Sequence, residues 1–429
     1  MARLLRVQAL LLCAVLSAAA ASRGAGEREV GDAVALLQAR AEPPSASDER
    51  PEALWQSLES EPPASSDSFP QALVNFGDAQ YVAYMTLGRQ MIAAILDTGS
   101  YDLVVFGVDC RSCGVAAHFN HHLSHSYWES PVSVEQFYGS GKALANSARE
   151  RVAIGPYRIA NQSFWNVKYA QMPVLHTAAF EAIFGLGPPD TPVMNAWTTA
   201  EQASGEVLAY YDQGLQAPDW TMDAAKRALD AANDATQNPP LLRNARCTRF
   251  SVCLGARSGA DGVLVWNDTL AWRSPELFVR APVLGNTTWS VELANAGLGF
   301  HGVRESGVLA CDGGCRALVD SGTSILSAPA PVVEGLKQAF LQLDPSCSNL
   351  EVLPDLMFEV QGRLLSLPPD SYVAMVVEDH ARFMEDGRGA LGFRQPGWQC
   401  QLLIRETDAS STAGPLWILG MPFFRRYYT

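Results

Sequence analysis

Short apolar runs separated by glycine and proline dominate two long stretches of the chain, residues 72–187 and 250–428. Within the first stretch, the runs at 81–87, 91–96 and 103–106 predict strands, because each has the length of a buried strand and is too short for an ordinary helix. Many short strands punctuated by turn residues are typical of an all-β protein. We therefore expect an all-β architecture with only a few short helices.

Residues 188–244, between these stretches, follow a different pattern. Alanine recurs with Asp and Lys over 221–237, which predicts a helix that ends at the following Asn-Pro-Pro. A second helix is predicted at 331–341. We expect an extended helical insertion between the two β-rich stretches.

Two of the apolar runs end in nearly the same polar motif. The run at 94–96 leads into Asp97-Thr98-Gly99-Ser100, and the run at 317–319 leads into Asp320-Ser321-Gly322-Thr323. In each copy the glycine permits a sharp turn, and the hydroxyl groups can orient a carboxylate by hydrogen bonds. A single copy would be a common turn. The duplication predicts that each of two half-domains brings one aspartate to a shared cleft.

Two carboxyl groups in one cleft cannot both ionise easily, since repulsion between their charges raises the pKa of one of them. The pair then holds a single proton at acidic pH, so that one carboxylate acts as general base on a water and the other as general acid. That chemistry hydrolyses peptide bonds without a metal or a covalent intermediate, and we expect no cofactor. The alternative is that Asp97 and Asp320 are two unrelated turn-capping residues.

Composition supports two lobes and excludes one class of partner. The chain has 429 residues, 48% of them hydrophobic, which is enough for a sizeable core in each of two lobes. A net charge of −14 argues against nucleic acid as a partner, because no basic stripe is available to meet phosphates. We expect a monomer with an N-terminal lobe at 71–250, which includes the helical insertion, and a C-terminal lobe at 251–429.

The first residues have the features of a secretory signal peptide, which we place at 1–21. Arg3 and Arg6 precede an apolar stretch, and small residues at 18–21 offer a cleavage site. Residues 22–70 are rich in Ala, Glu, Pro and Ser, which predicts a flexible leader or a removable propeptide. No later stretch approaches the length of a membrane span, so we expect a protein of the secretory pathway, extracellular or in an acidic, lysosome-like compartment.

Glycosylation sequons and cysteines agree with that compartment. The sequons at Asn161, Asn267 and Asn286 would lie on the surface of a secreted glycoprotein. Eight cysteines remain after the signal peptide, and an even number in a secreted chain predicts disulfides. The simplest pairing joins neighbours in the sequence: Cys110 with Cys113, Cys247 with Cys253, Cys311 with Cys315, and Cys347 with Cys400. A zinc site at Cys110-x-x-Cys113 is the alternative, although no second such motif follows.

Four of the seven histidines lie together in the sequence, at positions 118, 121, 122 and 125. At helical spacing, His118 with His122 and His121 with His125 would form pairs able to bind a metal. The polar residues around them favour a solvated surface loop instead. We expect no metal site, with metal binding by these histidines as the alternative.

The order of motifs along the chain resembles that of the pepsin-like (family A1) aspartic proteases, from about Asn75 to Thr429. The matching motifs, besides the two aspartate motifs, are Phe137-Tyr138-Gly139-Ser140-Gly141, Ile183-Phe184-Gly185-Leu186-Gly187, Leu353-Pro354-Asp355-Leu356-Met357-Phe358 and Trp417-Ile418-Leu419-Gly420. The resemblance implies a bilobal double β-barrel and an endopeptidase that works at acidic pH through Asp97, Asp320 and a bound water. It also implies an extended polypeptide substrate in the cleft between the lobes, with apolar residues preferred on either side of the cut.

The resemblance assigns roles to the residues around the two aspartates. Ser100 and Thr323 would hydrogen-bond the outer carboxylate oxygens, and Gly99 and Gly322 would supply backbone amides near the same oxygens. Tyr138 would be the tyrosine of a flap, a hairpin that closes over the substrate. The flap tip at Gly139 and Ser140 would suit that motion.

The chain also departs from the family pattern. Val104 stands where the family usually has a tryptophan that partners the flap tyrosine, Glu181-Ala182 replaces the usual Asp-Gly, and Met421 replaces an aspartate. Further strand residues usually follow the position of Thr429, so we expect C-terminal strands to be missing. The alternative function is therefore a catalytically impaired member that binds a peptide or protein in the same cleft.

Overall fold

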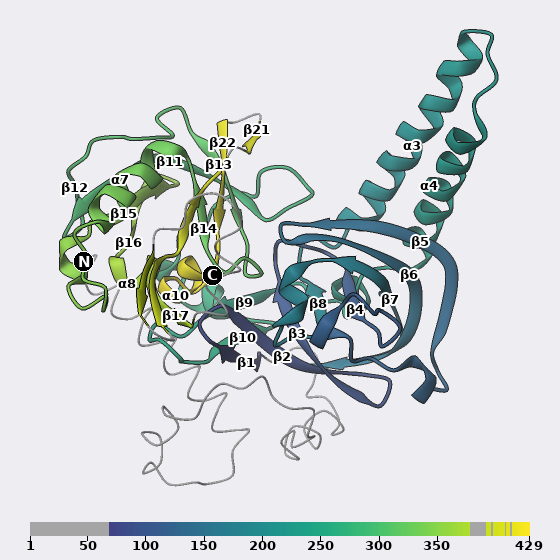
Figure 1. Cartoon of the computed structure of the whole chain (residues 1–429), viewed down its shortest axis with the longest axis horizontal. Coiled ribbons are helices and arrows are strands. Elements are labelled where there is room, and N and C mark those ends of the chain that lie inside the picture. The colour runs from purple at the N-terminus through teal and green to yellow at the C-terminus, as the bar shows by residue number, and fades with distance from the viewer. Residues whose placement is uncertain (1–67, 378–391, 396–397, 408, 412–413) are drawn as a thin grey trace.

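The computed structural model describes residues 68–377, 392–395, 398–407, 409–411 and 414–429. The expected signal peptide and nearly all of the expected leader, 22–70, lie outside these ranges. The described chain forms two β-rich lobes side by side, with a helical hairpin that projects from one of them (Figure 1). The all-β, two-lobed fold predicted from the sequence is confirmed.

The first lobe is built on a ten-stranded sheet with the strand order β5-β6-β7-β4-β8-β3-β2-β1-β10-β9. Its strands are β1 (Phe69–Phe76), β2 (Gln80–Leu87), β3 (Gln90–Asp97), β4 (Leu103–Phe106), β5 (Trp128–Tyr138), β6 (Gly141–Ile154), β7 (Tyr157–Gln171), β8 (Ala182–Gly185), β9 (Phe250–Cys253) and β10 (Gly262–Trp266). β6 also pairs with β2, which curls the sheet on itself. As the apolar runs predict, β2, β3 and β4 are buried on both faces.

The second lobe contains a nine-stranded sheet with the main order β16-β15-β11-β13-β22-β14-β20, and a separate three-stranded sheet with the order β17-β19-β18. Its strands are β11 (Ser290–Phe300), β12 (Val303–Arg304), β13 (Cys315–Val319), β14 (Leu326–Ala328), β15 (Asp355–Val360), β16 (Arg363–Leu367), β17 (Val373–Val377), β18 (Gly392–Gln395), β19 (Trp398–Leu402), β20 (Ile404–Glu406), β21 (Ser410–Ser411) and β22 (Gly414–Leu419). Its core is separate from those of the first lobe and includes Phe358 and Trp417, both fully buried.

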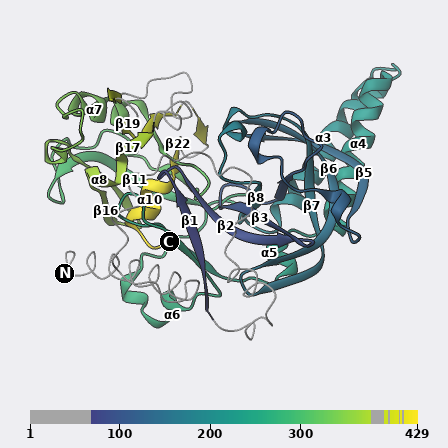
Figure 2. The same cartoon turned by 60° about the horizontal axis from the view of Figure 1, so that its bottom comes forward.

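Two helices are longer than the few short helices expected. They are α3 (Thr191–Asp212) and α4 (Asp219–Gln237), which form the projecting hairpin seen in both views (Figures 1 and 2). The remaining helices are α5 (Leu241–Asn244), α6 (Leu270–Arg273), α7 (Ala330–Phe340), α8 (Pro369–Tyr372) and α10 (Met421–Arg426), with short 3₁₀ turns η2 (Gly114–Ala116), η3 (His121–Leu123), η4 (Pro173–His176), η5 (Pro275–Leu277) and η6 (Leu350–Val352). The predicted helices at 221–237 and 331–341 correspond to α4 and α7.

The C-terminal residues pair with a strand of the first sheet. β1 pairs with β10, and the backbone of Thr429 exchanges hydrogen bonds with that of Val252 on β9, at 2.7 and 3.1 Å. Residues 250–266 therefore belong to the first sheet, and the second sheet begins at Ser290. The arrangement ties both halves of the chain to one shared set of strands.

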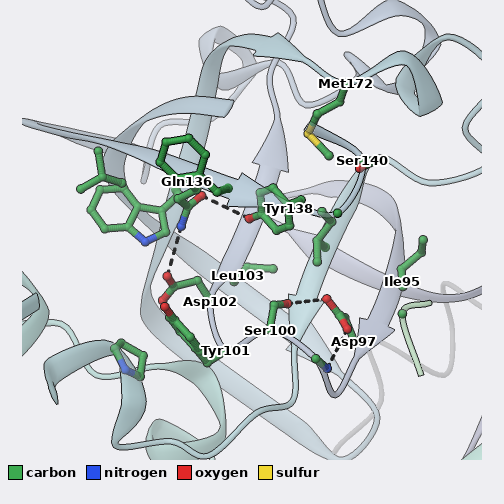
Figure 3. Close-up of a pocket in the computed structure, with 18 of the residues that line it drawn as sticks. Ile95, Asp97, Ser100, Tyr101, Asp102, Leu103, Gln136, Tyr138, Ser140 and Met172 are labelled. Atoms are coloured by element: carbon green, nitrogen blue, oxygen red, sulfur yellow. Dashed lines mark hydrogen bonds between the residues drawn. The ribbon is translucent and has the colours of Figure 1, made fainter. Parts of the chain in front are cut away.

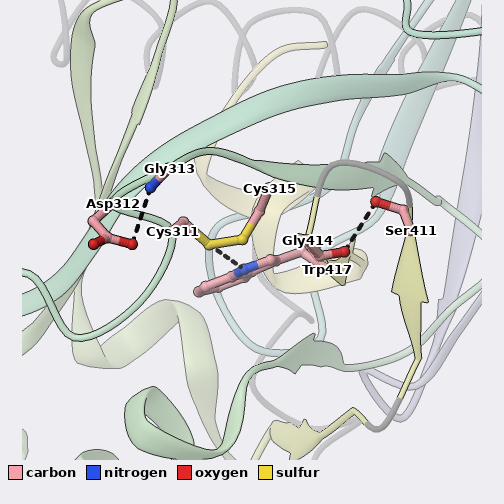
Figure 4. The surroundings of a disulfide bond; sticks show 7 residues. All are labelled: Cys311, Asp312, Gly313, Cys315, Ser411, Gly414 and Trp417. Carbon is pink, nitrogen blue, oxygen red and sulfur yellow. Dashed lines mark hydrogen bonds between the residues drawn. A yellow bond between two sulfur atoms is a disulfide. The ribbon is translucent and has the colours of Figure 1, made fainter.

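Three of the expected disulfides are present: Cys110–Cys113, Cys311–Cys315 and Cys347–Cys400. Figure 4 shows the second of these, where the indole of Trp417 donates a hydrogen bond of 3.1 Å to the Cys311 sulfur. The third joins residues 53 positions apart and closes a long loop of the second lobe.

The expected pair Cys247–Cys253 is wrong. Cys247 is a free thiol that packs against the main core of the first lobe and donates a hydrogen bond of 3.4 Å to the carbonyl of Arg249. Cys253 lies on β9 and contacts a different cluster, with Val263 and Val265. Cys253 is part of a disulfide whereas Cys247 is not, so the two sulfur atoms are not bonded to each other.

One sequon is also placed differently from the expectation. Asn161 and Asn286 are exposed, whereas Asn267 is only 7% exposed. The side-chain oxygen of Asn267 accepts a hydrogen bond of 3.1 Å from the Tyr157 hydroxyl. A buried amide in this contact cannot carry a glycan without breaking the local packing.

Among the described residues, no helix combines the length and the apolar character needed to cross a lipid bilayer.

Candidate active site

The two aspartate motifs occupy equivalent positions in the two lobes. Asp97 is the last residue of β3, which pairs in parallel with β8, and Asp320 directly follows β13, which pairs in parallel with β22. In both lobes the partner strand carries the apolar-apolar-glycine motif of the sequence, ending at Gly185 or at Leu419 just before Gly420. The duplicated sequence thus produces a duplicated local structure.

The motifs are held together by hydrogen bonds that cross between the lobes. The Thr98 amide donates to the Ser321 hydroxyl at 3.1 Å, and the Ser321 amide donates to the Thr98 hydroxyl at 2.8 Å. Each hydroxyl also donates to a carbonyl of the opposite lobe, Thr98 to Val319 at 2.8 Å and Ser321 to Leu96 at 2.6 Å. The four bonds are buried or partly buried, which fixes the two aspartates relative to each other.

Each aspartate is oriented by its own loop in the same way. Ser100 donates a hydrogen bond of 2.6 Å to Asp97 Oδ2, and Thr323 donates one of 2.6 Å to Asp320 Oδ2. The amides of Gly99 and Gly322 donate to the other oxygens, Asp97 Oδ1 at 2.8 Å and Asp320 Oδ1 at 2.9 Å. The expectation that hydroxyl and amide would meet the same oxygen is therefore wrong: each carboxylate is held at both oxygens.

Close approach of the carboxyl groups explains the glycines of the two loops. A Cβ atom at Gly322 would lie 2.2 Å from Asp97 Oδ1, and one at Gly99 would lie 2.6 Å from Asp320 Oδ1. Atoms that are not bonded to each other do not approach so closely, so glycine is what lets the two loops meet. Asp97 Oδ1 therefore lies against the loop of the second lobe, and Asp320 Oδ1 lies against the loop of the first.

This environment raises the pKa of Asp97 above its usual value. Burial is the main cause, and the nearby charge of Asp320 is the second. Hydrogen bonds from Ser100 and the Gly99 amide act in the opposite direction but do not outweigh these effects. A proton is therefore retained at the Asp97–Asp320 pair over a wide pH range.

The pair lies in a cleft with a volume of about 880 Å³ between the lobes. Apolar side chains line it near Asp97, among them Ile95, Leu103 and Met172, and Ile325 lines it on the second lobe. The cleft continues past the sheet to the helical hairpin, where residues of both α3 and α4 line it. A site of this size and shape accommodates several residues of an extended peptide.

The hairpin formed by β5 and β6 covers the cleft above Asp97. Tyr138, Gly139 and Ser140 at its tip all line the cleft. Phe137 is 74% exposed and extends into solvent. The structure thus places the predicted flap residues at the position from which a hairpin can close over a bound peptide.

Tyr138 begins a chain of contacts that the sequence does not reveal (Figure 3). Its hydroxyl donates a hydrogen bond of 3.3 Å to Gln136 Oε1, and Gln136 Nε2 donates one of 3.1 Å to Asp102 Oδ2. Burial raises the pKa of Asp102 to about 6, while hydrogen bonding by the Trp165 and Gln136 side chains acts to lower it. Asp102 is therefore a third carboxyl group of the cleft, half-buried and with a raised pKa.

A tryptophan on another strand, Trp165, lies beside Val104. Val104 on β4 pairs directly with Trp165 on β7, and both lie in the core cluster beneath the flap. The indole thus reaches the flap contacts from a neighbouring strand. Val104 and Trp165 are 61 positions apart and meet only because β4 pairs with β7. No local sequence pattern therefore indicated that a tryptophan lies beside Val104.

The other two departures have structural roles of their own. Met421 is buried against the core of the first lobe, which joins α10 to that lobe. Glu181 accepts a hydrogen bond of 3.0 Å from the Ala93 amide through Oε2. Neither side chain lines the cleft.

The histidine loop lies apart from this site, since none of His118, His121, His122 and His125 lines the cleft. Lining groups on both lobes are carboxyl, hydroxyl, amide and apolar, with Arg227 and Arg405 as the lining cations. The arrangement supports acid–base chemistry by a pair of carboxyl groups.

Two β-lobes that meet at a pair of hydroxyl-supported aspartates define the architecture of an aspartic protease. A sequence profile of the eukaryotic aspartyl protease family matches residues 80–215 and 248–429. The chain belongs to this family. The unmatched residues 216–247 cover α4 and α5, so half of the projecting hairpin is an addition to the family pattern.

Individual relatives are distant but extend over most of the chain. Pepsin A of Bos taurus is 24% identical over 369 residues, which cover 83% of this chain and 82% of the relative. Cathepsin E-A of Xenopus laevis is 26% identical over 369 residues, covering 83% and 78%. Renin of Ovis aries is 24% identical over 390 residues, covering 88% and 84%.

Proposed function

We propose that this protein is an aspartic endopeptidase that hydrolyses peptide bonds at acidic pH with a water activated by Asp97 and Asp320. The observation that carries the proposal is the paired support of the two carboxyl groups, each held by a hydroxyl and an amide and each facing the other across the lobe junction. The raised pKa of Asp97 supports a pair that shares one proton.

The reaction uses the single proton that Asp97 and Asp320 share. The ionised carboxylate takes a proton from the water while the water oxygen attacks the carbonyl carbon of the peptide bond. The protonated carboxyl group donates its proton to the carbonyl oxygen. Transfer of a proton to the nitrogen then lets the carbon–nitrogen bond break. Closure of the flap carrying Tyr138 would exclude bulk water during these steps.

The proposed substrate is an extended polypeptide with apolar residues beside the cut bond, since apolar side chains line the cleft next to Asp97. We further propose that the protein is a monomer that follows the secretory pathway to an extracellular or acidic, lysosome-like compartment. The disulfides and the exposed sequons at Asn161 and Asn286 support that route. Binding of nucleic acid is not proposed, because the net charge is −14.

The test is cleavage of a denatured protein substrate between about pH 3 and pH 7, with pepstatin as inhibitor. We expect cleavage at acidic pH that is abolished by pepstatin and by Asp97→Asn, and retained in Asp223→Asn, which changes an exposed carboxyl on α4. Loss of activity towards higher pH is expected because the pair then loses the proton that it needs as general acid. Cleavage that survives Asp97→Asn would contradict the mechanism.

The second candidate function is peptide binding without hydrolysis, which Val104 favours because it stands where the family usually has the tryptophan that partners the flap tyrosine. A folded wild-type protein that binds pepstatin but cleaves nothing across this pH range would support it over the endopeptidase.

A further inference from the structure

A cluster of metal-ligating side chains lies outside the cleft, where the loop after β4 meets the turn η3. Asp109, His121 and His122 each place one ligand atom so that all three atoms lie within 4.8 Å of one another. Asp109 Oδ2 is 3.6 Å from His121 Nδ1, and Asp109 Oδ1 is 3.9 Å from His122 Nε2. These separations are close to those between ligands that share one metal ion with bonds of about 2.0–2.2 Å.

The His121 nitrogen is the second observation that points to a ligand. Its Nδ1 atom is buried and has no hydrogen-bond partner among the described residues. A buried polar atom left unpaired is costly, and natural structures normally satisfy it. A cation between His121 and Asp109 would satisfy this atom and neutralise the carboxylate beside it.

The loop holds these ligands in place before any ion arrives. The Asn120 backbone is fixed by Gln90, whose side chain donates to the Asn120 carbonyl at 2.9 Å and accepts from the Asn120 amide at 2.8 Å. The Asn120 side chain in turn accepts from the His122 amide at 3.1 Å. The two imidazole rings lie 3.9 Å apart between centroids, and Tyr127 packs against His121 at 4.9 Å.

The second ligand loop is equally constrained. Asp109 directly precedes Cys110, which is bridged to Cys113. Asp109 also meets Lys168, whose ammonium lies 3.6 Å from Asp109 Oδ2 but 2.9 Å from Glu129 Oε2. The closer carboxylate holds the lysine, so Asp109 keeps its other oxygen, Oδ1, turned towards His122.

We propose that Asp109, His121 and His122 form a binding site for a divalent transition-metal ion such as zinc, with water completing the coordination. Two imidazole nitrogens and one carboxylate oxygen suit zinc, nickel or copper, whereas magnesium and calcium prefer oxygen ligands alone. The site differs from the helical pairs that the sequence suggested. His121 and His122 act as neighbours in a 3₁₀ turn, and His118 instead lies 3.4 Å from Glu181.

The test measures metal binding directly and needs no proteolytic activity. The purified chain, stripped with a chelator, is titrated with zinc by calorimetry, and cobalt is used as a spectroscopic probe of nitrogen coordination. We expect one equivalent of zinc with the wild type and a loss of affinity of at least about tenfold in His122→Ala and in Asp109→Asn. His125→Ala, in the same loop, and Asp97→Asn, in the cleft, should bind zinc as the wild type does.

Three outcomes would overturn the site. They are no zinc binding by the folded wild type, equal loss in His125→Ala and His122→Ala, and loss in Asp97→Asn alone, which would place the ion at the cleft. Because His122 is 69% exposed, its replacement should leave the melting temperature of the metal-free protein unchanged, which separates ligand loss from misfolding.

Discussion

At the scale of single residues, two carboxyl groups of the cleft, Asp97 and Asp102, hold their protons to a higher pH than usual. Burial raises the pKa of both Asp97 and Asp102, and in each case hydrogen bonds only partly offset the effect. A group whose folded pKa exceeds its unfolded value binds more protons in the folded state. Its contribution to stability is therefore complete at low pH and is lost as the pH rises through the folded pKa. These two groups therefore make the folded protein more stable at acidic pH than at neutral pH.

Replacing Asp97 should expose this dependence. In Asp97→Asn the buried group stays neutral at every pH, so the variant should melt a few degrees above the wild type at pH 7 and close to it at pH 4. Melting temperatures at the two pH values test this, with Asp223→Asn as the matched control at an exposed site. A variant that is less stable than the wild type at pH 7 would show that the raised pKa of Asp97 does not reduce the stability of the fold at that pH.

The contact chain behind the flap makes a second prediction. Gln136→Met keeps the length of the side chain but removes its bonds to Tyr138 and Asp102. The flap should then be less well positioned, and kcat/KM should fall about tenfold, corresponding to a loss of about 1.4 kcal/mol. Lys142→Met is the control, because Lys142 does not line the cleft and its replacement removes only the partly exposed ion pair with Glu135 on the same hairpin. Equal effects of the two changes would contradict a specific role for Gln136.

At the scale of elements, the helical hairpin is attached to the strand that carries the flap. α4 contacts β5, and Ser147 on β6 donates a hydrogen bond of 2.8 Å to Asp234 Oδ2 on α4. The buried positions of α4 are Thr221, Ala225 and Ala232, and such small side chains let the helix lie close to its neighbours. The hairpin and the flap strands form one packed unit.

Enlarging a buried alanine should disturb this packing. Ala232→Leu forces a larger side chain into a site with no exposed surface, and should lower the free energy of unfolding by about 1–3 kcal/mol. Asn233→Leu places the same side chain at the next, exposed position and should have little effect. Denaturant titration compares the two variants, and equal stabilities would mean that the helix is not packed here.

The sequence predicted these elements to different degrees. The strands around Asp97 were predictable because short apolar runs bounded by glycine have the length of buried strands, and α4 was predictable from its alanine content. The boundaries of α3 were not, because its threonines and aromatic residues do not form a clean apolar stripe. Trp165 and the unpaired Cys247 depend on tertiary contacts that no local pattern encodes.

At the scale of the whole molecule, the two lobes depend on each other at the aspartate loops. The two aspartate loops exchange four hydrogen bonds through Thr98 and Ser321, residues that are 223 positions apart. Each loop needs hydrogen-bond partners from the opposite lobe. The position of one carboxyl group is therefore set by the other half of the chain.

Removing one hydroxyl should affect both halves. Ser321→Ala leaves the Thr98 amide and the Leu96 carbonyl without their buried partner, and should lower the free energy of unfolding by about 2–4 kcal/mol together with more than tenfold loss of cleavage. Ser321→Thr keeps the hydroxyl and is the matched control. If the alanine and threonine variants behave alike in calorimetry and in the cleavage assay, the crossing bonds do not position the pair.

The same exchange of hydroxyl groups constrains how this chain can change through evolution. A substitution at position 98 alters the surroundings of Ser321, so the two halves cannot drift separately once their loops have met. Substitutions at positions 98 and 321 must therefore occur together, or each must keep a side-chain hydroxyl group. The tip of the flap at Gly139 is not constrained in this way, because a Cβ atom there would meet nothing within 4 Å. Substitutions at this position can therefore follow changes in the substrate.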